Sequence, residues 1–416
     1  MRKRMPKINF IFHFIGAVSF CIAGCEDGDQ TQVSGEYAVS VAAGDFDRND
    51  AVVAFSLPDY TEPGVYRMNA VNSGESVLVQ VDQNSKARFI LDELDAGQAQ
   101  TFAFRSDEPV TDYPEGINSR LEERTITFYD GSSGMFSYYH SEHELPDEFG
   151  DAYLRGGYLH PVRTPDGTVV TEQFSEGHPH QLGIFSAWTS TEFEGNTPDF
   201  WNIQDETGTI VTDSLDKIQD GPVYGGFRAR HGYVDLSEPE PQRALNEQWD
   251  LKAYPSPEES PYRFFDLTVT QSADTDKPLH LPQYHYGGVA VRGNDVWMDP
   301  DSVSISTSGG HDRPEANEER VRWVNMSGVV DGRSAGIAQL AHPENIRHPQ
   351  PVRVHPDDPY YVYTPMQLGD MSIEPGAPLE LRYRFVVFDG EPDHELLNRI
   401  WNDYAYPPGV TVSKNE

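Results

Sequence analysis

The sequence has few cysteines and few lysines. Its two cysteines, Cys21 and Cys25, both lie near the start of the 416-residue chain. The rest of the chain therefore has no disulfide framework, no cysteine-ligated zinc and no cysteine nucleophile. Only seven lysines occur, and 31 Lys and Arg residues against 67 Asp and Glu residues give a formal charge of −36. Binding nucleic-acid phosphates needs a basic surface, so this balance excludes a nucleic-acid partner.

Several common catalytic motifs are also missing. The sequence has no Gly-x-Ser-x-Gly, no His-Glu-x-x-His, no phosphate-binding loop and no dinucleotide fingerprint. These absences argue against serine hydrolases, zincins, nucleotide hydrolases and nicotinamide oxidoreductases. After the first 24 residues there is no apolar run of about 18 residues or more, the length that a membrane-spanning helix needs. The chain is instead rich in residues of turns and strands, with 35 Gly, 31 Pro, 21 Tyr and 21 Phe.

The N-terminus has the pattern of an export signal. Four basic residues within the first seven precede an apolar stretch over 8–22. The stretch ends in Ile22-Ala-Gly-Cys25, which resembles a bacterial lipobox. We predict a signal peptide over 1–24, lipidation of Cys25 and an acidic linker over 25–35. The chain would then be a cell-envelope lipoprotein of the outer membrane, on its surface or periplasmic face, with only the lipid in the bilayer. A plain signal peptide with an incidental cysteine is the alternative.

Alternating apolar and polar residues predict an all-β fold. Short runs at 37–41, 51–55, 77–81, 87–91 and 101–104 predict a small antiparallel β-sandwich over 36–112. Longer runs such as 125–128, 264–269 and 379–388 predict a large two-sheet antiparallel sandwich over 113–410. One helix is expected after Pro392-Asp393, because Leu396, Ile400 and Trp401 share a face at helical spacing.

Clusters of His, Tyr and Arg carry the candidate chemistry. On an extended strand His178 and His180 would face the same way and present two imidazoles to one ligand. A divalent metal there would need a third ligand such as Glu247, His231 or His285, and no spacing rule selects one. Hydrogen-bonded structural histidines are an equally weighted interpretation. No cofactor is therefore assigned, and a divalent metal stays open.

The same alternation applies to 284–286. Either Tyr284 and Tyr286 or His285, but not all three, would face a common pocket. Arginine beside histidine and tyrosine suits removal of a proton alpha to a carboxylate, because arginine neutralises the anion while histidine or tyrosine serves as base and acid. This is the chemistry of elimination at a uronic acid. Tryptophans such as Trp188 and Trp201 could stack on sugars, although an aromatic residue in a β protein more often belongs to the core.

Six motifs in a fixed order resemble a known family over about 154–406. They are Tyr158-Leu-His-Pro-Val-Arg163, His178-Pro-His180, Asp199-Phe-Trp201, Gly287-Gly-Val-Ala-Val-Arg292, Trp323-Val-Asn-Met-Ser-Gly-Val-Val-Asp331-Gly332 and His342-Pro-Glu-Asn-Ile-Arg-His348. Together they resemble a bacterial family of unknown function that is often labelled methane oxygenase PmoA. The literal label does not suit a mature chain without an apolar span. The resemblance implies a galactose mutarotase-like supersandwich with a carbohydrate-utilisation context.

The resemblance also implies site residues. It carries over His178, His180, Trp201, Arg292, Asp331, His342, Asn345, Arg347 and His348. Where the family continues with His-Arg-Gly, this chain has Gln181-Leu-Gly183. Glutamine can hydrogen-bond a sugar hydroxyl but cannot titrate. Asp331-Gly332 is equally consistent with a hairpin turn.

We therefore expect a lipoprotein that acts on an oligo- or polysaccharide, with elimination at a uronic acid as the leading reaction. A glycoside hydrolase using Glu247 and Asp331, and a non-catalytic glycan-binding lipoprotein, are the alternatives. Burial of His178 and His180 with hydrogen bonds to backbone would favour the non-catalytic glycan-binding lipoprotein. The acidic charge opposes a polyanionic glycan unless a local arginine cluster compensates. The catalytic candidates are His178, His180, His231, Tyr284, Arg292, Asp331 and Arg347. The substrate-binding candidates are Gln181, Trp188, Trp201, Arg228, Glu247, His285, His342, Asn345 and His348.

Overall fold

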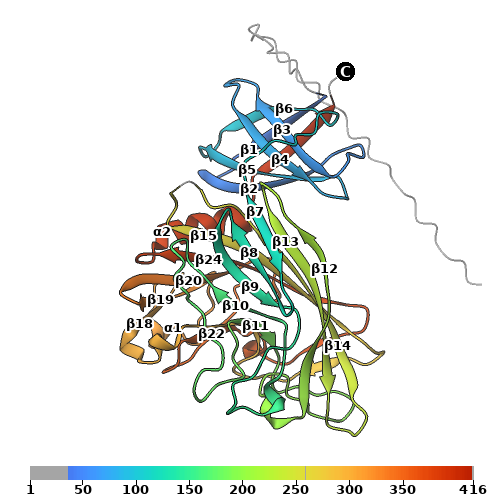
Figure 1. The fold of residues 1–416 in the computed structure, drawn as a ribbon, viewed down its shortest axis with the longest axis vertical. Coiled ribbons are helices and arrows are strands. Elements are labelled where there is room, and N and C mark those ends of the chain that lie inside the picture. Colours follow the sequence, from blue (N-terminus) through green and yellow to red (C-terminus); the bar gives the residue numbers. More distant parts are fainter. Residues whose placement is uncertain (1–35, 258, 415–416) are drawn as a thin grey trace, which may run out of the picture. The chain divides into compact units, whose positions relative to one another are not determined.

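A computed structural model describes residues 36–257 and 259–414. The expected signal peptide, the acylated Cys25 and the linker lie outside the described residues. What is described consists mainly of antiparallel β-sheets, which confirms the all-β expectation (Figure 1). None of its helices is long and apolar enough to cross a bilayer.

The N-terminal part forms one seven-stranded antiparallel sheet around its own core (Figure 1). Alternate residues of its first strand, Tyr37, Val39 and Val41, are buried in that core, as period-two patterning requires. All five runs predicted here are strands. In spatial order the strands are β2 (Arg48–Ser56), β5 (Lys86–Leu94), β4 (Ser76–Val81), β3 (Gly64–Ala70), β6 (Ala99–Phe104), β1 (Tyr37–Ala42) and β25 (Gly409–Lys414).

The last strand of this sheet comes from the other end of the chain. β25 pairs with β1 along its whole length, from Tyr37 opposite Lys414 to Ala42 opposite Gly409. The large domain expected from the sequence ends at 410, inside this strand, and no element was expected after it. Strand pairing between chain ends leaves no local signal, because the partner lies more than 360 residues away.

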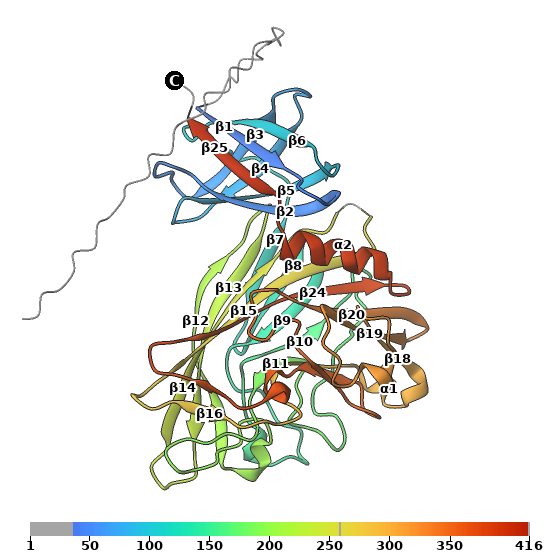
Figure 2. The same cartoon turned by 180° about the vertical axis from the view of Figure 1, so that it is seen from behind.

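The rest of the chain forms two eight-stranded antiparallel sheets (Figures 1 and 2). The first large sheet has the order β21 (Val352–Val354), β22 (Tyr360–Tyr363), β17 (Gly288–Arg292), β11 (Ile184–Ala187), β10 (Tyr158–Val162), β9 (Ser133–Tyr139), β8 (Thr125–Asp130) and β7 (Ile117–Leu121). The second large sheet has the order β12 (Gly208–Gln219), β13 (Gly225–Asp235), β14 (Gln242–Ala253), β15 (Tyr262–Ala273), β24 (Leu379–Asp389), β20 (Arg333–Ala341), β19 (Trp323–Val330) and β18 (Val303–Thr307).

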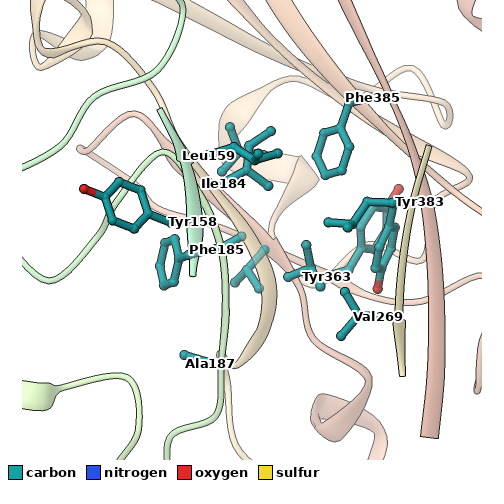
Figure 3. Close-up of a cluster of buried hydrophobic side chains, with 14 of the residues drawn as sticks. Tyr158, Leu159, Ile184, Phe185, Ala187, Val269, Tyr363, Tyr383 and Phe385 are labelled. Atoms are coloured by element: carbon teal, nitrogen blue, oxygen red, sulfur yellow. The ribbon is translucent and has the colours of Figure 1, made fainter. Parts of the chain in front are cut away.

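The main hydrophobic core lies between the two large sheets. Figure 3 shows Leu159 and Ile184 of the first sheet on the side of their strands that faces Phe385 of the second sheet. Tyr158 and Phe185 lie on the opposite side of the same strands (Figure 3). Both are nevertheless fully buried. The outer face of the first large sheet is therefore also covered by protein.

The smaller elements connect and cover the sheets. Helix α2 (His394–Ala405) begins where predicted, and the Asp393 side chain accepts hydrogen bonds from the Glu395 and Leu396 amides. Asp403 of α2 forms a buried ion pair of 2.9 Å with Arg48 of β2, which joins the helix to the small sheet. The other short elements are β16 (Leu279–Leu281), β23 (Met371–Ile373), α1 (Arg313–Ala316) and the 3-10 turns η1 (Asp151–Tyr153), η2 (Ile203–Asp205), η3 (Asp295–Trp297), η4 (Pro300–Ser302) and η5 (Pro365–Leu368).

Buried histidines make the stability of this fold depend on pH. The Nδ1 atom of His160 in β10 lies 3.0 Å from the Thr171 hydroxyl. The Thr171 oxygen already accepts a bond from the Val162 amide, so its proton is free to bond a neutral imidazole. Burial lowers the pKa of His160 from its ordinary 6.5 to about 4. Protonation therefore favours the unfolded chain below about pH 6.5.

We predict that His160 alone costs about 2 kcal/mol of unfolding free energy between pH 7 and pH 5. Stability is fully present above pH 6.5 and falls as the pH approaches 4, since the folded pKa is the lower one. The measurement is urea unfolding of the full-length chain at both pH values. The loss should shrink by that amount in His160→Asn and stay unchanged in His311→Asn, whose side chain is 49% exposed. An equal loss in the parent chain and in His160→Asn would contradict the assignment.

Candidate functional site

The candidate site lies on the outer face of the first large sheet. The hydroxyls of Tyr361 and Tyr363 in β22 reach backbone carbonyls of β20 in the second sheet at 3.4 and 3.5 Å. Side chains alternate along a strand, so Tyr360 points to the other face. Arg292 of β17 is the register partner of Tyr360 and shares that face. Connections from four parts of the chain cover this face.

These connections enclose a pocket of about 330 Å³, called here the His178 pocket. Five of its lining residues were candidates from the sequence, namely His178, His180, Gln181, Trp201 and His285. Tyr286 was considered only together with Tyr284, and six others were not candidates, namely Gly177, Asn202, Gln204, Arg353, His355 and Tyr360. No Asp or Glu of the described residues lines it. The volume is within the range of about 300 to 1,000 Å³ typical of small-ligand pockets.

His178 is paired with a carboxylate at the edge of the pocket. Its Nδ1 atom lies 2.9 Å from Oδ2 of Asp358. Nδ1 of His355 is 3.6 Å and a guanidinium nitrogen of Arg292 is 4.0 Å from the same oxygen. The His178 side chain is 36% exposed. A partly exposed imidazole beside a carboxylate is a suitable arrangement for proton transfer.

His180 differs from His178 in being buried. Burial, followed by the nearby charges of His178 and Arg292, lowers the pKa of His180 to about 4. Its imidazole is therefore neutral at pH 7, and it lines the pocket as a hydrogen-bonding group. The two histidines come from consecutive turns rather than a strand, with the His178 amide bonded to the Ser175 carbonyl. The extended strand expected over 178–180 is therefore absent from the described structure, although both rings line one pocket.

Arg292 supports the pocket rather than lining it. Its fully buried guanidinium donates to the Ser175 hydroxyl at 3.0 Å, the Gln181 amide oxygen at 3.1 Å and the Asp295 carboxylate at 3.3 Å. These bonds hold the turn that carries the two histidines. The structure argues against the assignment of Arg292 to a substrate carboxylate, because its side chain is fully buried and does not line the pocket.

The cation that lines the pocket is Arg353. One of its terminal nitrogens donates to the Asn317 side chain at 2.9 Å. Within the described parts of the chain, no carboxylate lies within 4.0 Å of it. Arg347, the second arginine proposed for substrate, instead donates to the carbonyls of Pro365, Gly369 and Asp370 at 2.7 to 2.8 Å. Its charge is used to hold a loop.

Aromatic rings form one wall of the pocket. The ring centroids of Trp201 and Tyr286 are 5.2 Å apart, and those of Trp201 and Tyr360 are 6.3 Å apart. The Tyr286 hydroxyl accepts a bond from the Asn202 amide at 3.2 Å, which leaves its own proton free to donate. His285 lines the pocket together with Tyr286, whereas Tyr284 does not. The prediction that His285 and Tyr286 face opposite ways was wrong, because 282–287 is a loop and its side chains need not alternate.

Other candidates lie between the two large sheets, away from the pocket. Glu247 is buried and accepts bonds from His231 at 3.0 Å, Tyr233 at 3.0 Å and Gln271 at 2.6 Å. Burial opposes the charge, but the bond and charge of His231 hold the pKa of Glu247 below its usual value. The buried indole of Trp188 donates to Gln271 at 2.7 Å, so it cannot stack on a sugar. This network is structural.

The remaining candidates are surface or packing residues. Asp331 and Gly332, with φ of 50° and 79°, make the turn between β19 and β20, as the hairpin interpretation requires. Arg228 is paired with Asp250 at 2.7 Å on neighbouring strands. His342 packs on Tyr404, His348 packs on Trp401, and Asn345 bonds the Arg382 backbone in both directions. None of these residues lines the His178 pocket.

The metal interpretation has no support in this geometry. Over residues 36–257 and 259–414, no group of three or more His, Cys, Asp or Glu side chains is placed to hold an ion. Two of the expected third ligands, His231 and Glu247, bond each other between the sheets. Sequence reasoning missed Arg353, His355, Asp358 and Tyr360. Their segment has the same His, Asp, Tyr and Arg composition as the recognised clusters, which was the available signal.

Comparisons with known proteins give a family and distant folds. A model of a family of unknown function, DUF6807, matches residues 125–402. No curated protein matches. Among solved structures, an alpha-mannosidase from Enterococcus faecalis V583 aligns with a TM-score of 0.43 and 9% identity, over 91% of this chain and 46% of that one. A glycosyl hydrolase family 38 protein from Enterococcus faecalis aligns with a TM-score of 0.38 and 9% identity, over 91% and 47%.

The chain spans just under half the length of these solved proteins. The family match covers about two thirds of the sequence, includes every residue of the His178 pocket and does not carry the methane oxygenase label. The chain belongs to the DUF6807 family of unknown function.

Proposed function

We propose that this protein binds an acidic saccharide in the His178 pocket and cleaves it by elimination at a uronic acid. The observation that carries the proposal is the convergence of three groups in one pocket. These are a guanidinium without an acidic partner, Arg353, an imidazole paired with a carboxylate, His178, and a tyrosine hydroxyl, Tyr286. Elimination needs these three functions, because it requires a carboxylate to be neutralised, a base and an acid.

The proposed elimination uses one residue for the carboxylate, one as base and one as acid. Arg353 binds the substrate carboxylate and stabilises the negative charge that develops on it. Nε2 of His178 accepts the proton from the carbon next to the carboxylate. The electron pair of that C–H bond forms a C=C bond while the adjacent C–O bond breaks. The leaving oxygen takes the proton of the Tyr286 hydroxyl, so the products are an unsaturated uronate and a free hydroxyl.

Asp358 suits His178 to the role of base. Nδ1 of His178 lies 2.9 Å from Oδ2 of Asp358, a buried oxygen that has no hydrogen-bond partner of good geometry in the described chain. In this proposal the nearby negative charge stabilises the imidazolium that forms when Nε2 of His178 accepts a proton. A guanidinium nitrogen of Arg292 lies 4.0 Å from the same carboxylate. His180, neutral at pH 7, can bond a sugar hydroxyl beside this pair.

The pocket differs in charge from the chain as a whole. The whole chain has a formal charge of −36, which repels a polyanion at long range. The pocket itself is lined by one arginine and four histidines, with no carboxylate among its lining residues. Salt screens the long-range repulsion over about 10 Å at 0.1 M, while contacts in the pocket persist. In this proposal the export signal and Cys25 would hold the protein in the cell envelope, where it meets polymeric saccharides.

We predict that the full-length protein produces unsaturated uronates from a polyuronate, seen as new ultraviolet absorbance. His178→Asn should lower kcat by about 10²- to 10⁴-fold, the usual contribution of a general base. Tyr286→Phe should lower it less, because water can supply the proton. The matched control is His311→Asn, since His311 also pairs with a carboxylate, 3.0 Å from Glu319, outside the pocket. New reducing ends without absorbance would replace elimination with hydrolysis, and binding without turnover would make the protein a glycan-binding lipoprotein.

A second prediction concerns the charge of the substrate. Arg353→Gln should raise KM for a uronate oligomer by about tenfold, because a hydrogen-bonded charge contact is lost. A methyl-esterified oligomer has no charge to neutralise, so its kcat/KM should change little. Arg120→Gln is the control, because Arg120 is 72% exposed and pairs with Glu122 on the surface. Equal losses on both substrates would show that Arg353 does not read the carboxylate.

A third prediction tests the hydrolase that uses Glu247 and Asp331. Asp331→Asn should keep full turnover, because asparagine also tolerates the left-handed turn. Glu247→Gln should destabilise the fold by about 3 to 5 kcal/mol, because it breaks a buried pair with His231. Urea unfolding and turnover of both variants are the measurements. Loss of turnover in Asp331→Asn with unchanged stability would return this residue to the site.

A further inference from the structure

A second cavity gathers positive charge in this acidic protein. It has a volume of about 360 Å³ and lies between β5 of the small sheet and β12–β14 of the second large sheet. Four basic side chains line it, Arg88, Lys217, Arg228 and Lys252, and together they define the basic cleft. Arg228 was a substrate-binding candidate from the sequence that the His178 pocket does not include.

Two of these charges are balanced and two are not. Arg88 pairs with Asp82 at 3.4 Å, and Arg228 pairs with Asp250 at 2.7 Å. For Lys217 and Lys252, no carboxylate of the described chain lies within 4.0 Å. The cleft thus has an excess of two positive charges where the chain as a whole is strongly negative.

The lysines of the chain are concentrated here. Between residues 36 and 414 there are five, and Lys217 and Lys252 line the cleft while Lys86 is close enough to Lys252 to lower its pKa. Burial is the main cause of that lowering, followed by Arg88, whereas Asp266 and Asp250 act in the opposite direction. A partly buried ammonium group with no carboxylate within ion-pair distance gains from a bound anion.

Lys217 is directed into the cleft by a distortion of its strand. It lies in β12 where the pairing with β13 shifts between Asp216 and Gln219, and its φ is 49°. Left-handed backbone is unfavourable for a residue with a side chain, and β-bulges redirect side chains at functional places. The amides of Gln83, Asn84 and Gln219 line the same cleft and can bond hydroxyl groups.

We infer that the basic cleft is a second binding site, for the anionic groups of an acidic saccharide. Its cations would bind carboxylates or sulfate esters, and its amides would bind neighbouring hydroxyls. The saccharide class rests on the proposed function, whereas the requirement for negative charge rests on the cleft alone. The cleft belongs to other strands than the His178 pocket, so it binds the polymer apart from the point of cleavage.

The test measures binding in a full-length double variant, His178→Asn with Arg353→Gln, which removes the base and the cation of the pocket. Calorimetry with a galacturonate tetramer should show one site per chain, with affinity falling as salt rises. Adding Lys217→Gln or Lys252→Gln should weaken this binding about tenfold each. Lys277→Gln, an exposed lysine outside the cleft, is the matched control. The methyl-esterified tetramer should not bind, and a sulfated galactose oligomer shows whether sulfate replaces carboxylate.

Absence of binding in the double variant, or equal binding with and without Lys217, would overturn the inference. Lys217 is exposed, so this variant decides the question even if Lys252→Gln does not fold. The outcome is separate from the proposed function. A protein that never releases unsaturated uronates but loses tetramer binding in Lys217→Gln refutes elimination and keeps the cleft. A protein that cleaves polyuronates but binds the tetramer only through Arg353 keeps the proposed elimination and refutes the basic cleft as a binding site.

Discussion

The buried guanidinium of Arg292 is the group on which the pocket geometry depends. A charge that is removed from water must be matched by hydrogen bonds, or the fold loses several kcal/mol. Arg292 meets this requirement with Ser175, Gln181 and Asp295, and with Asp358 at 4.0 Å. These partners come from three different connections. The electrostatic need of one side chain in β17 therefore holds together the loops that carry His178 and its carboxylate.

Burial on both faces explains why such a residue can stand in a sheet. Every residue of β11, β17 and β22 is buried, so these strands do not show alternation between apolar and polar residues. Their inner faces meet the second large sheet, and their outer faces meet long connections. A sheet edge with one solvated face would have left the same arginine in water, where it would position nothing. These long connections are therefore needed to form the site, because they cover the outer face of the sheet.

The two sites proposed here use the chain's limited positive charge in different ways. In the His178 pocket a single arginine lies among imidazoles and phenols, an arrangement suited to one carboxylate and to proton transfer. In the basic cleft four cations surround two acids, an arrangement suited to holding charge without chemistry. Both are local exceptions to a formal charge of −36. Such a surface keeps the protein soluble and restricts acidic ligands to the places where cations converge.

The sequence by itself determined the fold class, eight of the strands and the longer helix. Alternation along β1 and the apolar face of Leu397, Ile400 and Trp401 are local patterns, set by the geometry of a strand and of a helix. It also found His178, His180 and Trp201. Only the tertiary structure decided which clusters meet. β17 lies between β11 and β22 in the sheet, although 100 residues separate it from β11 and 67 from β22 along the chain. Such pairings depend on the packing of the whole core, and for this reason Arg353 and Asp358 belong to the site while Glu247 and Arg347 do not.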